Sequence, residues 1–352
     1  MTKYVICEKM YSANHAGPKA RTDVADILAA DGWRRLFVQR REDGSTIDKF
    51  CAIPVNLQNW IRVLNRVKQD DVLLIQFPLA MYPQVSRTAV PIIKKIRKKK
   101  VRLIFLIHDL ESLRGYDDSV EQDFLSCADA LIVHNDVMRD YVLQRGYCSN
   151  VVSLGVFDYL VPPNQPRSKC IRGIDIAGNL NPEKAGYIYK LAEEMPEAEI
   201  NLYGPNIVDD NPVIASWYKG SFPPDRLAQE MKGRFGLVWD GNSIDTCSGE
   251  YGEYLKYNNP HKLSMYLAIG KPVIVWKQSA SATLVESFGI GYCVSSLKEA
   301  VDYANSVSTD AYRSLKTQLE DISRKIRDGY FLKRALSSIE IIKYTPKESE
   351  NA

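Results

Sequence analysis

The chain has 352 residues, of which 45% are hydrophobic and 25% are charged. Its length exceeds what one hydrophobic core usually supports, so two domains are expected, and its composition excludes a disordered or fibrous protein. The 46 Lys and Arg residues nearly balance the 43 Asp and Glu residues, and the resulting net charge of +3 excludes an overall nucleic-acid-binding surface.

Short runs rich in β-branched residues alternate with segments of helical period in the first part of the chain. Segments such as 22–30 and 59–67 place apolar residues three and four apart, as crossover helices do. We expect strands at residues 4–7, 36–38, 72–77, 101–107, 130–133 and 151–154. This alternation is typical of a parallel α/β sheet.

A proline-rich polar segment at 161–170 predicts a linker, and a second α/β series follows it. The chain therefore divides into a domain at 1–160, the linker, a domain at 171–328, and a helix and tail at 329–352 that begin with a break at Gly329. In the second domain we expect strands at 171–177, 200–203, 236–239, 272–276 and 291–294. The prediction is two doubly wound α/β domains in tandem.

The loop after the first predicted strand is small and polar, and it leads into a helix. Ligands bind beyond the carboxyl ends of parallel strands, so Asn14, His15 and Gly17 are candidate substrate contacts. The loop equally suits a helix cap built on Thr22 or Asp23. It lacks the G-x-G-x-x-G and Walker lysine patterns, which weakens dinucleotide dehydrogenase and P-loop interpretations.

His108 and Asp109 directly follow the apolar strand predicted at 101–107. Two titratable side chains that leave a buried strand at the edge of a cleft are candidates for catalysis. Asp109 also suits a helix cap. Successive strand residues point to opposite faces, so the two side chains are expected to have different roles.

The second domain opens with a strand, Gly178, Asn179 and a helix start near Lys184. Free backbone N–H groups and the helix dipole favour an anion at such a place, although a β-turn with a solvated lysine has the same pattern. Tyr203 ends the next strand, where it belongs either to the core or against a nucleobase.

Residues 257–276 give the strongest pattern in the chain. Pro260 suits the first turn of a helix, Lys262 adds a full positive charge there, and Gly270 ends the helix before the next strand. A helix N-terminus with an adjacent lysine is suited to hold a diphosphate.

The segment 258–276, with 235–239 and 289–292, resembles the donor-binding half of GT-B glycosyltransferases. More narrowly, it is similar to the streptococcal glucosyltransferases that extend the first GlcNAc on serine-rich adhesins and to the related bacterial galactofuranosyltransferases. Residues 105–110 and 329–334 also match. The resemblance implies a GT-B fold, with two Rossmann-like domains facing a cleft and a C-terminal helix that crosses back to the first domain.

The resemblance also implies transfer of a hexose, glucose or galactofuranose, from a UDP-sugar held by the second domain to a carbohydrate acceptor held by the first, with no metal or other cofactor. It assigns Lys262 to the diphosphate, Tyr203 to the uridine side, and Lys184 to a nearby basic position. The candidate donor-binding residues are Asn14, Gly17, Gly178, Asn179, Lys184, Tyr203, Asn259, His261, Lys262 and Thr283.

One departure from the larger group of retaining GT-B enzymes bears on stereochemistry. Those enzymes place two glutamates across this helix start, where the present chain has Tyr257 and Met265. The departure favours inversion, which requires a general base. We assign Asp109 as the base and His108 as the residue that orients the sugar, with His15 as the reserve candidate.

Two other functions fit the same fold: a non-catalytic GT-B partner of another transferase, and a UDP-sugar epimerase.

The run 94–102 holds seven basic residues and predicts either a solvated helix end or contact with an anionic membrane. An odd number of cysteines, seven, without a C-x-x-C pair argues for a reducing cytoplasm, and the charged N-terminus lacks a signal peptide. We therefore expect a cytoplasmic protein, at the inner face of the membrane if the basic run binds lipid. A homo-oligomer is left open.

Overall fold

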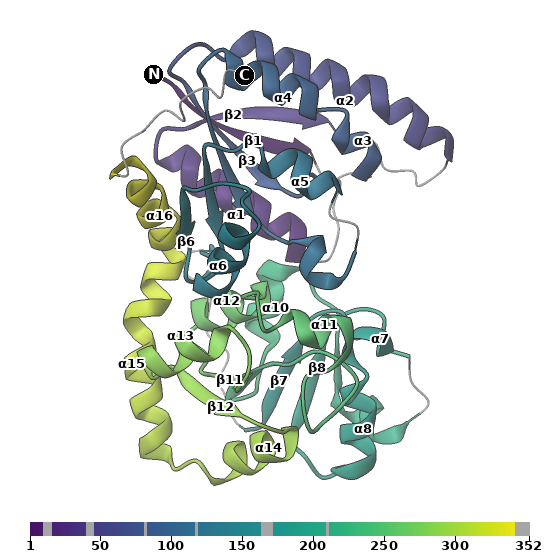
Figure 1. Ribbon diagram of the computed structural model, residues 1–352. Helices are drawn as coiled ribbons and strands as arrows, with labels where there is room; N and C mark the ends of the chain where they lie inside the picture. Colours follow the sequence, from purple (N-terminus) through teal and green to yellow (C-terminus); the bar gives the residue numbers. More distant parts are fainter. Residues whose placement is uncertain are drawn as a thin grey trace.

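The computed structural model describes residues 1–9, 16–39, 46–80, 83–116, 119–162, 172–208 and 211–341. Two parallel sheets form two stacked α/β units (Figure 1). Asn14 and His15 lie outside the described residues.

The first sheet has the strand order β2-β1-β3-β4-β5-β6, and every pair is parallel. Its strands are β1 (Lys3–Lys9), β2 (Arg34–Gln39), β3 (Val72–Phe77), β4 (Arg102–Ile107), β5 (Ala130–Val133) and β6 (Val151–Ser153). The connections are α1 (Ala16–Ala30), α2 (Thr46–Arg66), α3 (Pro83–Arg87), α4 (Val90–Lys98), η1 (Glu111–Arg114), α5 (Ser119–Leu125) and α6 (Asp136–Gln144).

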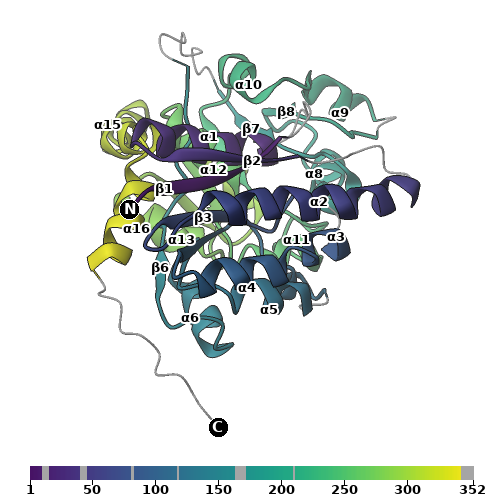
Figure 2. The same ribbon diagram turned by 90° about the horizontal axis from the view of Figure 1, so that it is seen from above.

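Helices cover both faces of the first sheet, as a doubly wound domain requires. Leu28 of α1 packs on one face, while Trp60 of α2, Ile93 of α4 and Met138 of α6 pack on the other. Figure 2 shows α1 on one side of the strands, with α2 and α4 on the other. The strands are buried on both faces, which explains their nearly continuous apolar sequences.

The second sheet has the order β12-β11-β10-β7-β8-β9, again with parallel pairs. Its strands are β7 (Ile174–Ala177), β8 (Ile200–Tyr203), β9 (Tyr218–Gly220), β10 (Phe235–Val238), β11 (Val273–Trp276) and β12 (Gly291–Val294). Its helices are α7 (Pro182–Ala185), α8 (Tyr187–Glu194), α9 (Pro212–Trp217), α10 (Pro224–Glu230), α11 (Gly249–Tyr254), α12 (His261–Ala268), α13 (Ser281–Phe288) and α14 (Leu297–Ser306). This is the strand order of a Rossmann fold.

The predicted strands are confirmed to within three residues at their ends, and one strand, β9, was not expected. With only three residues and an exposed lysine, β9 has too short a pattern to indicate a strand. The limits 160, 170 and 328 stay predictions, although the two sheets separate between Ser153 and Ile174.

The C-terminal helices join the two domains, as expected. Helix α15 (Thr309–Arg327) packs along α12, and α16 (Tyr330–Ile341) lies against β6 (Figure 1). Asp158 accepts hydrogen bonds from the backbone N–H groups of Phe331 (3.1 Å) and Leu332 (2.7 Å), which caps α16. Between the two helices, Gly329 has a φ of 71°, and a side chain there would meet Ile27 of α1.

One apolar core runs through both domains. It includes Leu28 and Leu106 of the first domain, Val156 and Phe157 after β6, and Leu332 of α16 together with the second-domain core. Burial of this shared surface stabilises one arrangement of the domains, about 25 cal/mol for each Å² of apolar surface removed from water. Among the described helices, none combines the length and apolar character needed to cross a bilayer.

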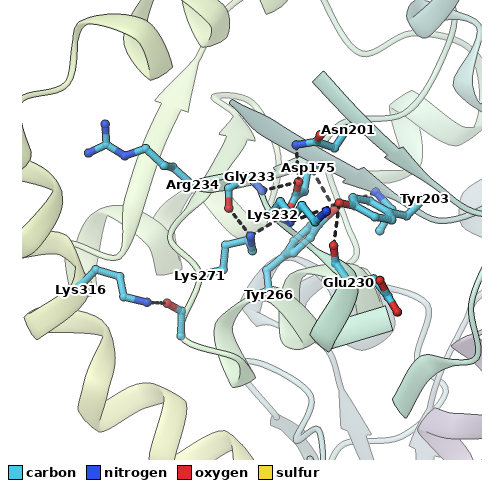
Figure 3. A network of polar contacts seen from close by, with 12 residues as sticks. Asp175, Asn201, Tyr203, Glu230, Lys232, Gly233, Arg234, Tyr266, Lys271 and Lys316 are labelled. Carbon is cyan, nitrogen blue, oxygen red and sulfur yellow. Dashed lines mark hydrogen bonds and ion pairs between the residues drawn. The ribbon is translucent and has the colours of Figure 1, made fainter. Parts of the chain in front are cut away.

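A buried ion pair lies inside the second domain (Figure 3). The Nζ of Lys271 is 2.6 Å from Oδ2 of Asp175, and their side chains are 2% and 0% exposed. The other carboxylate oxygen of Asp175 accepts from the N–H of Gly233 (2.8 Å) and the amide of Asn201 (3.0 Å). Every oxygen of the buried carboxylate therefore has a partner, which compensates its desolvation.

Candidate active site

A chain of polar contacts lies at the carboxyl ends of β1, β3 and β4. The amide nitrogen of Gln76 donates to the carbonyl of Arg21 (3.2 Å), and its oxygen lies 2.8 Å from Nε2 of His108. Arg21 in turn pairs with Glu8 at 3.1 Å. Because the Gln76 nitrogen already donates, its oxygen accepts from His108, which places the imidazole proton on Nε2 and leaves Nδ1 as an acceptor.

His108 is uncharged in this environment. Burial lowers its pKa well below the usual range, and Arg21, His261 and His134 lower it further. Its ring stacks on Phe157 with centroids 5.4 Å apart and planes 10° apart. A neutral, fixed imidazole suits the orientation of a sugar hydroxyl.

Asp109 has different surroundings from His108. Its Oδ1 lies 2.8 Å from a guanidinium nitrogen of Arg114, and its side chain is 36% exposed. The guanidinium also sits 4.7 Å from the ring centre of Tyr254, whose hydroxyl accepts from the N–H of Leu110 (3.1 Å). Because Tyr254 belongs to α11 of the second domain, Asp109 stands where the two domains meet.

Asn259, which the sequence assigns to the donor, joins the two domains in the structure. Its backbone N–H donates to Nδ1 of His134 (3.1 Å), and its amide nitrogen donates to the carbonyls of His134 (3.4 Å) and Gly155. Its amide oxygen accepts from Asn135 (3.1 Å) and Ser281 (3.2 Å). With a 2% exposed side chain whose amide nitrogen and oxygen are both engaged, Asn259 connects protein segments.

His261 is the first residue of α12, and it faces the first domain. Its ring centre lies 4.8 Å from that of Phe157 and 6.5 Å from those of His108 and Tyr159. Burial lowers its pKa to about 3, and His134 and Lys19 add to the effect. Both ring nitrogens are buried without a hydrogen-bond partner among the described residues. Such nitrogens are costly unless a ligand or water pairs with them.

Lys262, the next residue of α12, lies beside two charged residues of the second domain, Asp240 and Lys184. Its Nζ donates to the carbonyl of Trp239 and to Oδ1 of Asp240, both at 2.8 Å. Lys184 lies 4.0 Å from the other carboxylate oxygen of Asp240. Two predicted basic residues are thus brought together at the N-terminus of α12. Pro260 is the N-cap, with extended backbone, and does not belong to the first turn as predicted.

The loop after β7 is shaped by its own side chains. Oδ1 of Asn179 accepts from the N–H of Asn181 (3.1 Å) and the amide of Asn206 (2.9 Å). Gly178 has a φ of 140°, and the space where its side chain would stand is open. Asn179 therefore supports the loop, while Gly178 leaves room beside it for a ligand.

Tyr203, which the resemblance assigns to the uridine side, lies in the core. Its side chain is 1% exposed, and its hydroxyl donates to the carbonyl of Glu230 (3.0 Å) and accepts from the N–H of Lys232 (3.2 Å). Figure 3 shows the ring beside the Asp175 network. A ring enclosed in this way offers no face to a nucleobase.

The remaining predicted residues lie on helices near the junction of the domains. Gly17 is exposed in the first turn of α1, two residues from Lys19, which lies 3.6 Å from Asp225 of the second domain. Thr283 is exposed in the first turn of α13, the helix whose Ser281 contacts Asn259.

The sequence interpretation missed His134, Asn135, Gln76 and Asp240. His134 and Asn135 follow β5 just as His108 and Asp109 follow β4, and Asp240 follows β10 in the same way. The strand-end rule that selected His108 therefore also applies to these positions. Across the described ranges, no group of three or more His, Cys, Asp or Glu side chains is arranged to hold a metal ion.

A surface cavity of about 390 Å³ lies away from these groups, beside β12 and α14. It includes none of the predicted site residues. Its lining consists of Tyr292, Ser296, Lys298, Glu299, Asp302, Tyr303 and Ser306. The cavity is therefore separate from the candidate site. We place that site at the junction of the domains, where the buried histidines and Lys262 lie.

Comparison with known proteins agrees with this architecture. Trehalose-6-phosphate synthase, solved in a study of glycosyltransfer with retention, superposes with a TM-score of 0.61 over 97% of this chain and 100% of that chain, at 13% identity. At that identity the likeness shows the GT-B fold alone, and it confirms the predicted fold class.

Sequence relatives are more specific. The β-1,6-galactofuranosyltransferase WbbI of Escherichia coli is 32% identical over 96% of this chain and 98% of its own length. Glucosyltransferase 3 of Streptococcus gordonii is 28% identical over 78% of this chain and 80% of its own length. Residues 3–156 and 174–339 match the N-terminal and C-terminal domains of the family described as Glucosyltransferase 3-like. The chain therefore belongs to the Glucosyltransferase 3-like family and is a glycosyltransferase of the GT-B fold.

Proposed function

We propose that the protein transfers galactofuranose or glucose from its UDP-sugar to a carbohydrate acceptor, with inversion and without a metal ion. The observation that carries this proposal is the position of Lys262, with Lys184 nearby, at the N-terminus of α12. Galactofuranose is the sugar named for the E. coli relative, which covers nearly the whole chain, and glucose is named for the streptococcal one.

The two lysines and the helix N-terminus suit the diphosphate. The bond between the anomeric carbon and the phosphate oxygen breaks during transfer, and negative charge grows on the departing UDP. Lys262 and Lys184 stabilise this charge, together with the α12 dipole. Pro260 gives α12 no side-chain cap, which suits a helix end whose first N–H groups bind a phosphate oxygen.

The sugar and acceptor are placed against the first domain. His261 supplies buried ring nitrogens for sugar hydroxyls, and His108 supplies a neutral acceptor at Nδ1. Asp109 acts as the base: Arg114 holds its Oδ1, and the carboxylate takes the proton of the acceptor hydroxyl as that oxygen attacks the anomeric carbon. Formation of a β product, as named for the E. coli relative, from an α-linked UDP-sugar requires inversion.

The basic run places the acceptor-side domain near a membrane in this proposal. Three of its residues are held by the protein: Arg97 pairs with Asp129 (3.0 Å), Lys99 donates to two carbonyls, and Arg102 donates to the carbonyl of Ile339 (2.9 Å). Arg97 and Lys99 are exposed despite these contacts, and four further exposed cations are Lys94, Lys95, Lys98 and Lys100. At about 1 kcal/mol each near an anionic surface, they support peripheral contact with the inner face of the membrane. Loss of vesicle binding on replacing all four by Gln tests this part.

The test of the main function is a transfer assay with UDP-galactofuranose and UDP-glucose, each with and without a panel of carbohydrate acceptors. We expect UDP release that depends on the acceptor, and a product heavier by one hexose in mass spectrometry. Conversion of the donor without any acceptor indicates an epimerase. Absence of both UDP binding and turnover indicates a non-catalytic partner subunit.

A further inference from the structure

Asp240 is the second residue after β10 and lies between the two lysines of the proposed diphosphate site. Its Oδ1 accepts from Lys262 at 2.8 Å, its Oδ2 is 4.0 Å from Lys184, and its side chain is 8% exposed. A carboxylate beside a site for an anionic ligand repels that ligand. The presence of Asp240 at this position therefore indicates another role. Its contacts with Lys262 indicate what that role is.

The ammonium group of a lysine has three donors and no acceptor. Two donors of Lys262 are engaged, one by Oδ1 of Asp240 and one by the carbonyl of Trp239, both at 2.8 Å. Because these two contacts fix the direction of the Nζ–H bonds, the third donor has one defined direction. Lys262 is thereby pre-oriented and loses little further freedom when it binds a phosphate oxygen.

The loop that holds Asp240 is itself held by backbone contacts. The N–H of Gly241 donates to the carbonyl of Lys184 (2.7 Å), and the carbonyl of Gly241 accepts from Tyr187 (3.1 Å). Gly241 has a φ of 110°, and a side chain there would overlap the backbone of Ser248. The carboxylate, Lys184 and Lys262 are therefore positioned as one unit.

The charge of Lys262 also depends on its neighbours. Burial lowers its pKa, Asp240 opposes that effect, and Lys184 adds to it. The Cys247 thiol also faces Lys262, and burial raises its pKa, so it is neutral near pH 7. Among the charged groups of the described residues, Asp240 is the one that favours the ammonium form of Lys262.

We propose that Asp240 is a positioning residue for the donor: it aims the free N–H of Lys262 at the diphosphate and maintains the positive charge of this buried ammonium group. The proposal rests on the proposed function, because it takes Lys262 as the diphosphate lysine. Asp240 acts through Lys262 and is not assigned a contact with the reacting atoms.

The test is the affinity for UDP of Asp240→Asn, measured by calorimetry between pH 7 and pH 9.5. The matched control is Asp245→Asn, which neutralises an exposed aspartate of the same loop. At every pH, the Kd of each variant is divided by the Kd of the wild type. This ratio cancels the effect that ionisation of UDP itself has on the affinity. Circular dichroism and urea unfolding establish that each variant is folded.

We expect Asp240→Asn to weaken UDP binding by roughly tenfold or more, and the ratio to grow as pH rises, because Lys262 then lacks the carboxylate that favours its ammonium form. Asp245→Asn should give a ratio near one throughout. Asp240→Glu, which keeps the charge, should restore a ratio that does not depend on pH. A purely structural role for Asp240 predicts a ratio that is independent of pH in all variants.

A ratio for Asp240→Asn that does not change with pH overturns the role of Asp240. Lys262→Ala then separates the two conclusions. If Lys262→Ala has lost UDP affinity, the donor site stands without Asp240. If Lys262→Ala binds UDP like the wild type, the proposed donor site and the role of Asp240 both fall.

Discussion

The backbone N–H of Asn259 donates a hydrogen bond of 3.1 Å to Nδ1 of His134, and this bond joins the second domain to the first. The contact requires an unprotonated Nδ1, because a charged imidazole has no acceptor. Burial lowers the pKa of His134 to about 4, against an ordinary value of 6.5. The junction of the domains therefore depends on pH.

The sign of this dependence follows from the lowered pKa. Between pH 6.5 and pH 4 the unfolded chain binds a proton at His134 that the folded chain does not, so stability is complete above pH 6.5 and is lost as pH falls towards 4. The share due to His134 is about 2 kcal/mol between pH 7 and pH 5. Urea unfolding at the two pH values should show that His134→Gln reduces the loss by about this amount. An unchanged loss would mean that His134 has the same pKa in the folded and the unfolded chain.

Lys262→Ala should reduce UDP affinity and turnover together. A charge-assisted contact is worth roughly 1.5–3 kcal/mol, or about 10- to 150-fold in Kd. Titration with UDP measures the effect, and Lys298→Ala, which removes an exposed lysine of α14, serves as the control. Wild-type UDP affinity in Lys262→Ala would remove the proposed diphosphate site.

Asp109→Asn should bind UDP normally and transfer slowly. General-base help contributes typically ~10²- to 10⁴-fold, so the loss should appear in kcat, with donor affinity unchanged. Asp140→Asn, on the exposed side of α6, should retain full turnover. If Asp109→Asn keeps its turnover while His15→Ala abolishes it, the base lies in the loop after β1.

Transfer should continue in the presence of EDTA. The sequence has no D-x-D motif placed after a strand, and in the proposed mechanism Lys262 and Lys184 stabilise the charge of the departing UDP. Initial rates after dialysis against EDTA should match those of untreated enzyme. Loss of activity that manganese restores would show instead that the diphosphate is held through a metal ion.

Lys271→Met should destabilise the second domain by about 3–5 kcal/mol, because it leaves the Asp175 carboxylate buried without its cation (Figure 3). The double variant Asp175→Asn with Lys271→Met should recover part of this loss. Urea unfolding measures both. Since the pair lies towards the amino ends of the strands, away from Lys262, the folded variants should keep their UDP affinity. Equal destabilisation by the single and double variants would show that the pair itself contributes little.

Local patterns in the sequence predict much of the architecture. The runs at 72–77, 130–133, 200–203 and 291–294 coincide with β3, β5, β8 and β12, and Gly329 separates α15 from α16 as expected. These features depend on residues that are close in the chain: a buried parallel strand is a short apolar run, and a left-handed residue between helices favours glycine. The end of α12 near Gly270 and the position of Lys262 near its start were predicted on the same basis.

Partners far apart in the chain decided the rest, and no periodicity encodes them. Tyr203 and Asn259 occupy the strand end and helix start that ligands favour, yet Tyr203 is enclosed beside Glu230 and Asn259 bonds to His134, 125 residues away. The contacts of Asp240 form only because the loop after β10 packs beside α12 and Lys184. The sequence determined the two sheets, the family and the positive charge at α12. The packing of the domains determined which polar side chains are already paired, because that depends on three-dimensional distances between groups the chain keeps apart.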